Sequence, residues 1–181
     1  MRARFMTLIL LAAPLMPSPA GATSVAPLAL DDLVGRSERI AYARVESQSA
    51  RWTADHSAIY TEVTLRVLQP MKGPAAMTAG ETITVRREGG VVDGIGMRVS
   101  GAATFAVGEE VVVFTERRGQ ALWTVGMAQG KMHVAEVAGQ KVVLRQMAGL
   151  VFVNGVAPSE PTSRPLEELI ADVATRAGST R

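Results

Sequence analysis

The chain has no cysteine, and it is poor in histidine and aromatic residues. The missing cysteines exclude disulfide bonds, thiol catalysis, Cys-ligated zinc and iron–sulfur sites, and a lipid-modified N-terminal cysteine. Phe, Trp and Tyr make up 4% of the residues. Once a core is filled, few rings remain for a carbohydrate or single-stranded nucleic-acid platform.

A strong net charge is also missing. The chain carries 19 Lys and Arg against 17 Asp and Glu, and Arg2 and Arg4 lie in the first 22 residues, which leaves 17 against 17 beyond them. The basic residues are scattered rather than gathered in one block. Nucleic acid is therefore not expected as a partner, because its capture depends on an excess of positive charge.

The N-terminus has the pattern of an export signal. Arg2 and Arg4 precede an apolar run over 5–16, and Ala20-Gly21-Ala22 follows after a short Pro/Ser/Ala stretch. This order predicts a secretory signal peptide over residues 1–22, cut before Thr23. The run is shorter than the about 20 residues that a membrane span needs. We expect a periplasmic or extracellular mature protein, secreted without a membrane span.

Short alternating segments dominate the rest of the sequence. The clearest is 59–68, and the other expected strands are 40–46, 82–86, 111–114, 122–125, 131–137, 141–145 and 150–153. Asp93-Gly94 and Ala138-Gly139 have the chemistry of tight turns. Many short strands separated by such turns predict one mainly β domain over 23–181, a small antiparallel barrel (OB-like) or a sandwich.

Two helices are expected to frame this sheet. A short N-terminal helix over 31–36 has Asp31 as its candidate N-cap, with Leu33 and Val34 facing inward. A C-terminal helix over about 165–177, capped by Thr162 or Ser163, has apolar residues at helical spacing. This amphipathic pattern predicts a helix docked on the sheet or over an open end of the barrel.

No catalytic pattern or cofactor motif is recognised. G-x-S-x-G, S-x-x-K and HExxH are absent. The glycine-rich segment 89–96 lacks the Lys-Ser/Thr of a phosphate loop and is expected to form a hairpin, so no cofactor is predicted. The adjacent carboxylates Glu109 and Glu110 are expected to point to opposite faces of a strand rather than flank a glycosidic bond.

The leading hypothesis is accordingly a non-catalytic binding module whose partner is another protein or an envelope component. The expected contact surface is the loop with Trp52, Asp55 and His56, together with the hairpin around Asp93, because loops at the ends of such folds host ligands and Trp anchors interfaces. One alternative is a metal-handling protein or hydrolase that uses His56 and His133. Another is a secreted protease inhibitor.

Several segments together resemble a group of exported bacterial proteins of uncharacterised function. The shared motifs are PL-x-L-x-x-L with S-x-x-I, (L/M)KG, GG-x-x-x-G-x-G, F-x-x-GE-x-x-V-x-F and GM-x-QGK, which lie between Pro27 and Lys131. The resemblance implies export and a small β-barrel but no mechanism. The strand–KG–strand arrangement is also similar to the netrin-like, OB-type module of metalloproteinase inhibitors. Their cysteine-anchored inhibitory N-terminus has no counterpart here.

Overall fold

The computed structural model describes residues 23–147, 149–155 and 161–178, and its architecture is mainly β. The helices are α1 (Leu30–Arg36) and α2 (Leu166–Gly178), with short 3-10 turns η1 (Met127–Gly130) and η2 (Val153–Gly155). The strands are β1 (Thr23–Val25), β2 (Arg39–Trp52), β3 (Ile59–Lys72), β4 (Thr82–Glu88), β5 (Gly90–Val92), β6 (Ile95–Met97), β7 (Glu110–Arg118), β8 (Ala121–Thr124), β9 (Lys131–Val137), β10 (Gln140–Arg145), β11 (Leu150–Phe152) and β12 (Ser163–Pro165).

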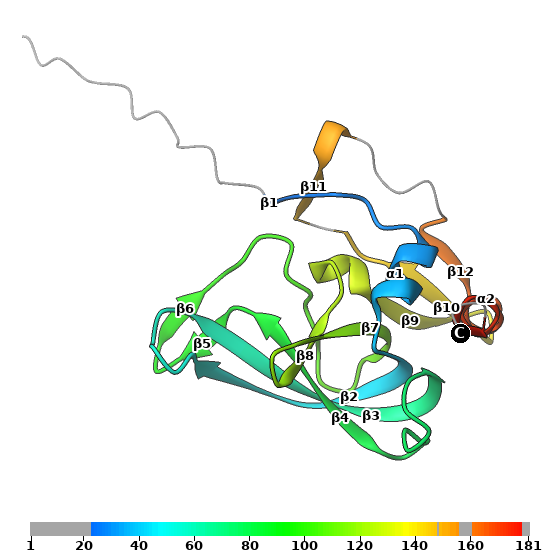
Figure 1. Ribbon diagram of the computed structural model, residues 1–181, viewed down its shortest axis with the longest axis horizontal. Helices are drawn as coiled ribbons and strands as arrows, with labels where there is room; N and C mark the ends of the chain where they lie inside the picture. The colour runs from blue at the N-terminus through cyan, green and yellow to red at the C-terminus, as the bar shows by residue number, and fades with distance from the viewer. Residues whose placement is uncertain (1–22, 148, 156–160, 179–181) are drawn as a thin grey trace, which may run out of the picture.

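Eight strands form one sheet in the order β12-β10-β9-β7-β2-β3-β4-β8. A further pairing of β7 with β8 joins five of them, β7, β2, β3, β4 and β8, into a closed ring of pairings (Figure 1). The sheet is mixed, because β8 meets β4 in parallel after leaving β7 as a hairpin. The expectation of a purely antiparallel sheet was therefore wrong in this detail, whereas the mainly β architecture is confirmed.

The pair β2–β3 contains three irregularities in its register. Both strands are 14 residues long, and the three shifts lie between Ile40 and Ser47. Such bulges increase local twist and allow a long strand to curve. Glu109 O accepts a 2.8 Å hydrogen bond from the amide of Val45, and the amide of Gly108 bonds to Val45 O at 2.8 Å, so the start of β7 is also fixed beside these irregularities.

Two separate hydrophobic cores result, one on each side of β2 and β7. The first, called here the ring-interior core, contains Ala41, Ala43, Val45, Val63, Leu65, Val67, Met77, Ile83, Val85, Ala103, Phe105, Val111, Val113 and Leu122. The second, the helix-covered core, contains Leu28, Leu30, Leu33, Val34, Ile40, Tyr42, Val112, Phe114, Val125, Met132, Val134, Val143, Leu166, Leu169 and Val173. Alternation along β7 divides 111–114 between the two cores, which explains why this run is apolar without interruption.

Helix α1 occupies the expected place, but its N-cap was predicted wrongly. The helix begins at Leu30 with Ala29 as N-cap, and the Asp32 carboxylate accepts a hydrogen bond from the Ala29 amide at 3.1 Å. Asp31 lies inside the first turn, where its carboxylate pairs with Arg176 of α2 at 2.5 Å. The charge pair joins the two helices, which pack side by side over the helix-covered core (Figure 1).

Helix α2 is docked on the sheet as expected, through Leu166, Leu169 and Val173. Its predicted cap was wrong, because Ser163 belongs to the short strand β12 and pairs with Leu144 of β10. Backbone pairing at the edge of the sheet takes precedence there over a side-chain cap.

The predicted signal peptide, residues 1–22, lies outside the described residues, as does the segment 156–160. Neither helix in the described part of the chain has the length and apolar character needed to cross a membrane.

Candidate functional site

The loop between β2 and β3 is organised around Asp55. Its carboxylate accepts hydrogen bonds from Thr53 Oγ1 at 2.6 Å, Ser57 Oγ at 2.8 Å and the Ser57 amide at 3.2 Å. These hydrogen bonds from Thr53 and Ser57 lower the pKa of Asp55 to about 2. Across the base of the loop, the Thr53 amide donates to Ala58 O at 2.8 Å. Asp55 therefore holds the loop in shape from within.

Trp52 was expected in this loop, but it is the last residue of β2, where it pairs with Ile59. Its ring lies against that of His56 in the loop. Their rings are stacked, with centroids 5.8 Å apart and planes inclined by 20°. His56 has a φ of 56°, a left-handed backbone conformation that the Asp55-centred turn imposes. Trp52 is partly exposed and His56 is exposed, so the stacked pair presents a ring surface to solvent.

The hairpin that carries Asp93 lies at the same end of the molecule as this loop (Figure 1). Asp93 and Gly94 form its tight turn with φ values of 51° and 78°, as expected for the type I′ geometry. The hairpin is fixed to the start of β3, where the Gly89 amide donates to Ile59 O at 2.8 Å. Beside the turn, Val91 and Ile95 are 67% and 56% exposed. The four predicted contact residues thus share one end, called here the tip surface.

The two histidines are not brought together. His133 lies on β9, opposite Val111 of β7 and Leu144 of β10, whereas His56 lies beyond the far end of β2. His133 Nδ1 is 3.0 Å from Glu109 Oε1. No group of three or more His, Asp or Glu suited to a metal ion exists among residues 23–147, 149–155 and 161–178. The shared site that the metal or hydrolase alternative requires is therefore not formed by this pair.

Glu109 holds a buried lysine on the ring-interior side of the sheet. Its carboxylate pairs with Lys131 Nζ, and the Lys131 side chain is 4% exposed. Burial tends to raise the pKa of Glu109, but hydrogen bonds from Lys131 and the Ala106 amide outweigh it, so the pKa lies below its usual value. Phe105 covers the Lys131 ammonium, 5.5 Å from the ring centroid. Paired in this way, Lys131 is held as a structural cation.

Glu110 points to the opposite face, as the alternation along the strand predicted. It accepts hydrogen bonds from Tyr42 Oη, from Arg44 Nη2 at 2.7 Å and from Lys141 Nζ at 2.7 Å. Partial burial opposes ionisation, yet the hydrogen bonds from Lys141, Tyr42 and Arg44 lower the pKa of Glu110 to about 2. The two neighbouring carboxylates thus take part in two separate clusters of charged groups.

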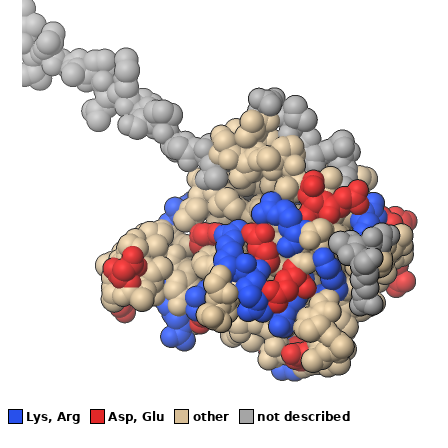
Figure 2. Space-filling view, viewed as in Figure 1, with Lys and Arg blue, Asp and Glu red and all other residues tan. Residues whose placement is uncertain are grey.

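A third cluster, which the sequence did not reveal, covers the outside of β3, β4 and β8. The Arg86 guanidinium lies 4.3 Å from the centre of the Tyr60 ring, and Arg118 lies 5.7 Å from that of Trp123. Arg86 also pairs with Glu62 at 2.9 Å. Figure 2 shows Lys and Arg interleaved with Asp and Glu across the visible face, so neither sign of charge dominates there. The parallel pairing of β4 with β8 brings Tyr60 and Trp123 together. No local sequence pattern predicts that pairing.

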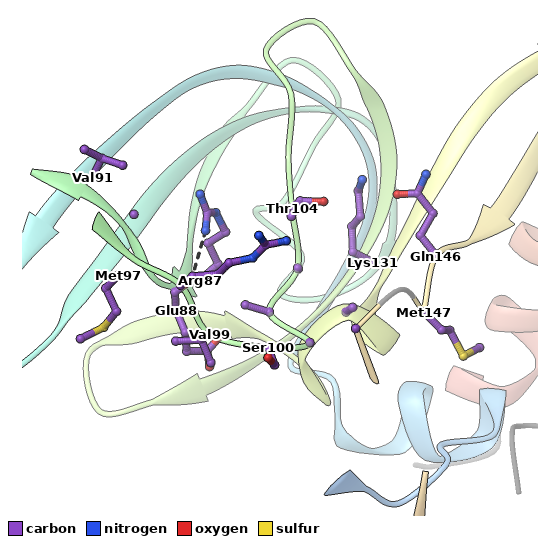
Figure 3. Close-up of a pocket in the computed structure, with 17 residues that line it drawn as sticks. Arg87, Glu88, Val91, Met97, Val99, Ser100, Thr104, Lys131, Gln146 and Met147 are labelled. Carbon is purple, nitrogen blue, oxygen red and sulfur yellow. Dashed lines mark hydrogen bonds between the residues drawn. The ribbon is translucent and has the colours of Figure 1, made fainter. Parts of the chain in front are cut away.

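A concavity lies next to the tip surface and is lined in part by the segment that links β6 to β7. Its volume is about 840 Å³. Arg87 of β4 contributes one side, Lys131 and Gln146 the other, and Ser100 and Thr104 belong to the linking segment (Figure 3). Alternation along β4 places Arg87 on the same side as the buried residue Val85. That pattern was available in the sequence and could have identified Arg87 as an inward-facing cation.

The GM-x-QGK segment has a clear structural role at the other side of the ring. Gln129 is 2% exposed, and its side chain accepts from the Leu28 amide at 2.8 Å and donates to Ala26 O at 3.1 Å. Gly130 passes so close to Val125 that an added Cβ would lie 2.3 Å from Val125 O. The segment therefore fastens the chain that leads into α1.

Comparison with known proteins gives no match to a family model, to a curated protein or to a solved structure.

Proposed function

We propose that this protein is an exported, non-catalytic binding module that contacts a protein or envelope component through its tip surface. The observation that carries the proposal is the composition of that end: Trp52, at the end of β2, is stacked on His56 of the ordered loop, and the exposed side chains of Val91 and Ile95 lie at the same end. Exposed apolar groups next to an aromatic anchor are typical of protein interaction sites. The hydrogen bonds of Asp55 reduce the entropy that the loop loses on binding.

The proposal includes an OB-like character for the five-stranded ring. The β7–β8 contact that closes the ring supports it, as does the parallel pairing of β4 with β8 in an otherwise antiparallel ring. In OB-type barrels the loop between the first two strands belongs to the ligand-binding region. The corresponding connection here is 53–58, which carries Asp55 and His56. Fold analogy alone does not identify a ligand.

Export is the second component of the proposal and places the partner in the periplasm or outside the cell. It rests on the charged, apolar and small-residue order of residues 1–22. Expression of the full chain in a bacterial host, followed by fractionation and N-terminal sequencing, tests it. The expected product begins at Thr23 and leaves the cytoplasm. An uncut chain retained in the cytoplasm would contradict export.

Site-specific photo-crosslinking tests the contact surface. A photoreactive amino acid at Ile95 should crosslink a discrete partner in envelope extract, since the side chain is 56% exposed on the tip surface. The matched control is position 137, where Val137 is 54% exposed on β9, on the opposite side of the molecule (Figure 1). Trp52→Ala should abolish the crosslink from position 95. Equal crosslinking from 95 and 137, or no effect of Trp52→Ala, would remove the tip surface from consideration.

A further inference from the structure

The concavity of about 840 Å³, lined in part by the 98–104 segment, has the dimensions of a ligand site. Cavities of roughly 300–1,000 Å³ with a few converging polar groups are typical of small-molecule sites. Its residues come from four places: the end of β4, the β5–β6 hairpin, the linking segment, and the chain around β9 and β10. Val91 of the hairpin belongs to both the cavity wall and the tip surface, whereas Trp52, His56 and Ile95 do not line the cavity. Variants that leave Val91 unchanged can therefore test the cavity separately from the tip surface.

Arg87 is the cation at the end of β4 that lines this cavity, and like its neighbour Glu88 it has one buried polar atom without a partner among the described residues. Its Nη1 donates to Glu88 O at 3.1 Å, whereas its Nε is buried and has no hydrogen-bond partner among the described residues. Burial lowers the pKa of Arg87, against an opposing effect of the Glu88 charge. A guanidinium is suited to bind a carboxylate through two parallel hydrogen bonds. A buried donor left without a partner is rare in folded proteins and calls for an explanation.

The other charges of the wall are compensated to different degrees. Lys131 is paired with Glu109. Glu88 Oε1 lies 3.4 Å from Arg118 Nη1, whereas its buried Oε2 has no hydrogen-bond partner among the described residues. Neither Arg87 nor Arg98 has a carboxylate oxygen within 4.0 Å in the part of the chain that the structure describes. Arg98 is exposed. Two guanidinium groups, Arg87 and Arg98, thus face one partly compensated carboxylate, Glu88, and the positive balance of the wall favours an anion.

The remainder of the wall is largely apolar and adaptable. Met97, Val99 and Met147 contribute side chains around the cavity (Figure 3). Methionine side chains are flexible and adapt to ligands of varied shape. A purely inorganic anion would leave this apolar surface unused.

We propose that the cavity binds a small amphiphilic carboxylate: the carboxylate accepts hydrogen bonds from Arg87 and the apolar chain lies against Met97, Val99 and Met147. Ser100 and Thr104 supply hydroxyl groups on the linking segment for further polar contacts. No bond is made or broken, so the site is a binding site.

Calorimetric titration of the purified full-length secreted protein with sodium octanoate tests the proposal. Octylammonium and octanol share the apolar chain but lack the carboxylate, and inorganic phosphate offers the negative charge alone. Saturable octanoate binding is expected. Octylammonium, octanol and phosphate should each bind with an affinity at least about tenfold lower, because each lacks either the carboxylate or the apolar chain. Equal binding of octanol or of phosphate, or no saturable octanoate binding up to about 10 mM, would overturn the proposal.

Substitutions then assign the binding to Arg87. Arg87→Gln should weaken octanoate binding at least about tenfold through loss of the charged hydrogen bonds. The matched control is Arg86→Gln, which removes the same charge from the adjacent residue of β4, on the opposite face, where Arg86 pairs with Glu62. Equal losses in both variants would overturn the assignment, since they would indicate a general effect of charge.

A third variant guards against a folding defect. Val99→Trp adds a bulky ring to the cavity wall at a half-buried position of the linking segment and retains Arg87, so it should also abolish octanoate binding. Circular dichroism confirms that each variant is folded. Unchanged binding by folded Val99→Trp would place the ligand elsewhere and overturn the proposal. None of these variants alters Trp52, so crosslinking through the tip surface should continue, and the two proposals can fail independently.

Discussion

The ring-interior core and the helix-covered core lie on opposite faces of the same two strands, yet they are closed by different means. Strand pairing closes the ring interior, through the contacts of β8 with both β7 and β4. The helix-covered core is closed by side-chain packing of α1 and α2 and by the preceding chain at Leu28. Backbone ladders resist local opening more than a docked helix does. The helix-covered core is therefore the part expected to open first.

The ionised side chains on the two faces of the sheet also differ in their burial. On the ring-interior side, Lys131 and Glu109 are 4% and 10% exposed and have each other as partners. On the other side, Glu110 has partners that reach water, because the Arg44 and Lys141 side chains are 55% and 46% exposed. Leaving a charge without a partner costs much more free energy in the low-dielectric interior than at the solvent-exposed surface. Two neighbouring carboxylates should consequently differ strongly in their effect on stability.

The largest effect is expected from Glu109→Gln. The substitution leaves Lys131 buried without its counter-ion, which typically destabilises a protein by about 3–5 kcal/mol. Denaturation in guanidinium chloride measures the loss. The double variant Glu109→Gln with Lys131→Met removes both charges and should recover most of the stability. A single variant as stable as the wild type would show that the pair is not isolated from water.

Leucine truncations in each core sharpen the comparison between them. Leu65→Ala in the ring interior and Leu169→Ala in α2 both remove fully buried side chains and should each cost about 2–5 kcal/mol. Their hydrogen-exchange patterns should differ. Leu169→Ala is expected to speed exchange in α1 and α2 alone, whereas Leu65→Ala should speed it throughout the ring. Identical patterns would mean that the two cores unfold as one unit.

The sequence predicts those strands and turns whose formation depends on residues close together in the chain. The strand 131–137 has the predicted bounds, and Asp93, Gly94 and Gly139 have the positive φ angles that their residue types tolerate, whereas Ala138 adopts a φ of 51° that alanine does not favour. Pairing between distant segments has no such signature. Alternation identifies 82–86 and 122–125 as strands, but it does not reveal that β4 and β8 run in parallel and close the ring. Long-range closure depends on the packing of the whole chain.

The candidate site was predictable to the same degree. The sequence places Trp52 next to the 53–58 loop and predicts the Asp93 turn as a hairpin, because each assignment needs only neighbouring residues, although Trp52 itself ends strand β2. The position of Arg87 in a cavity depends on segments far apart in the sequence. The cap at Ser163 failed for a related reason, since pairing of β12 with β10 involves residues about 20 positions away.

Gln129 offers a smaller perturbation confined to the helix-covered core. Gln129→Met keeps the size of the side chain but leaves the Leu28 amide and Ala26 O without their partners. An unsatisfied buried polar group costs about 1–3 kcal/mol. Guanidinium denaturation should show this loss, and the Leu28 amide should exchange faster. Unchanged exchange at Leu28 would contradict the view that Gln129 fastens the chain leading into α1.

The smallest effect is expected from Glu110, and it depends on pH. Its folded-state pKa of about 2 lies below the ordinary 4.5, so its stabilisation is present above about pH 4.5 and declines as the pH falls toward 2. Tyr42, Arg44 and Lys141 face the carboxylate, and solvent screening of the two cations limits the contribution to about 1 kcal/mol. Glu110→Gln should therefore lower the unfolding midpoint at pH 6 and converge with the wild type near pH 2. Lys141→Met should reduce the same pH-dependent difference. A constant gap between Glu110→Gln and wild type across this range would show that the cluster acts through packing rather than through the Glu110 charge.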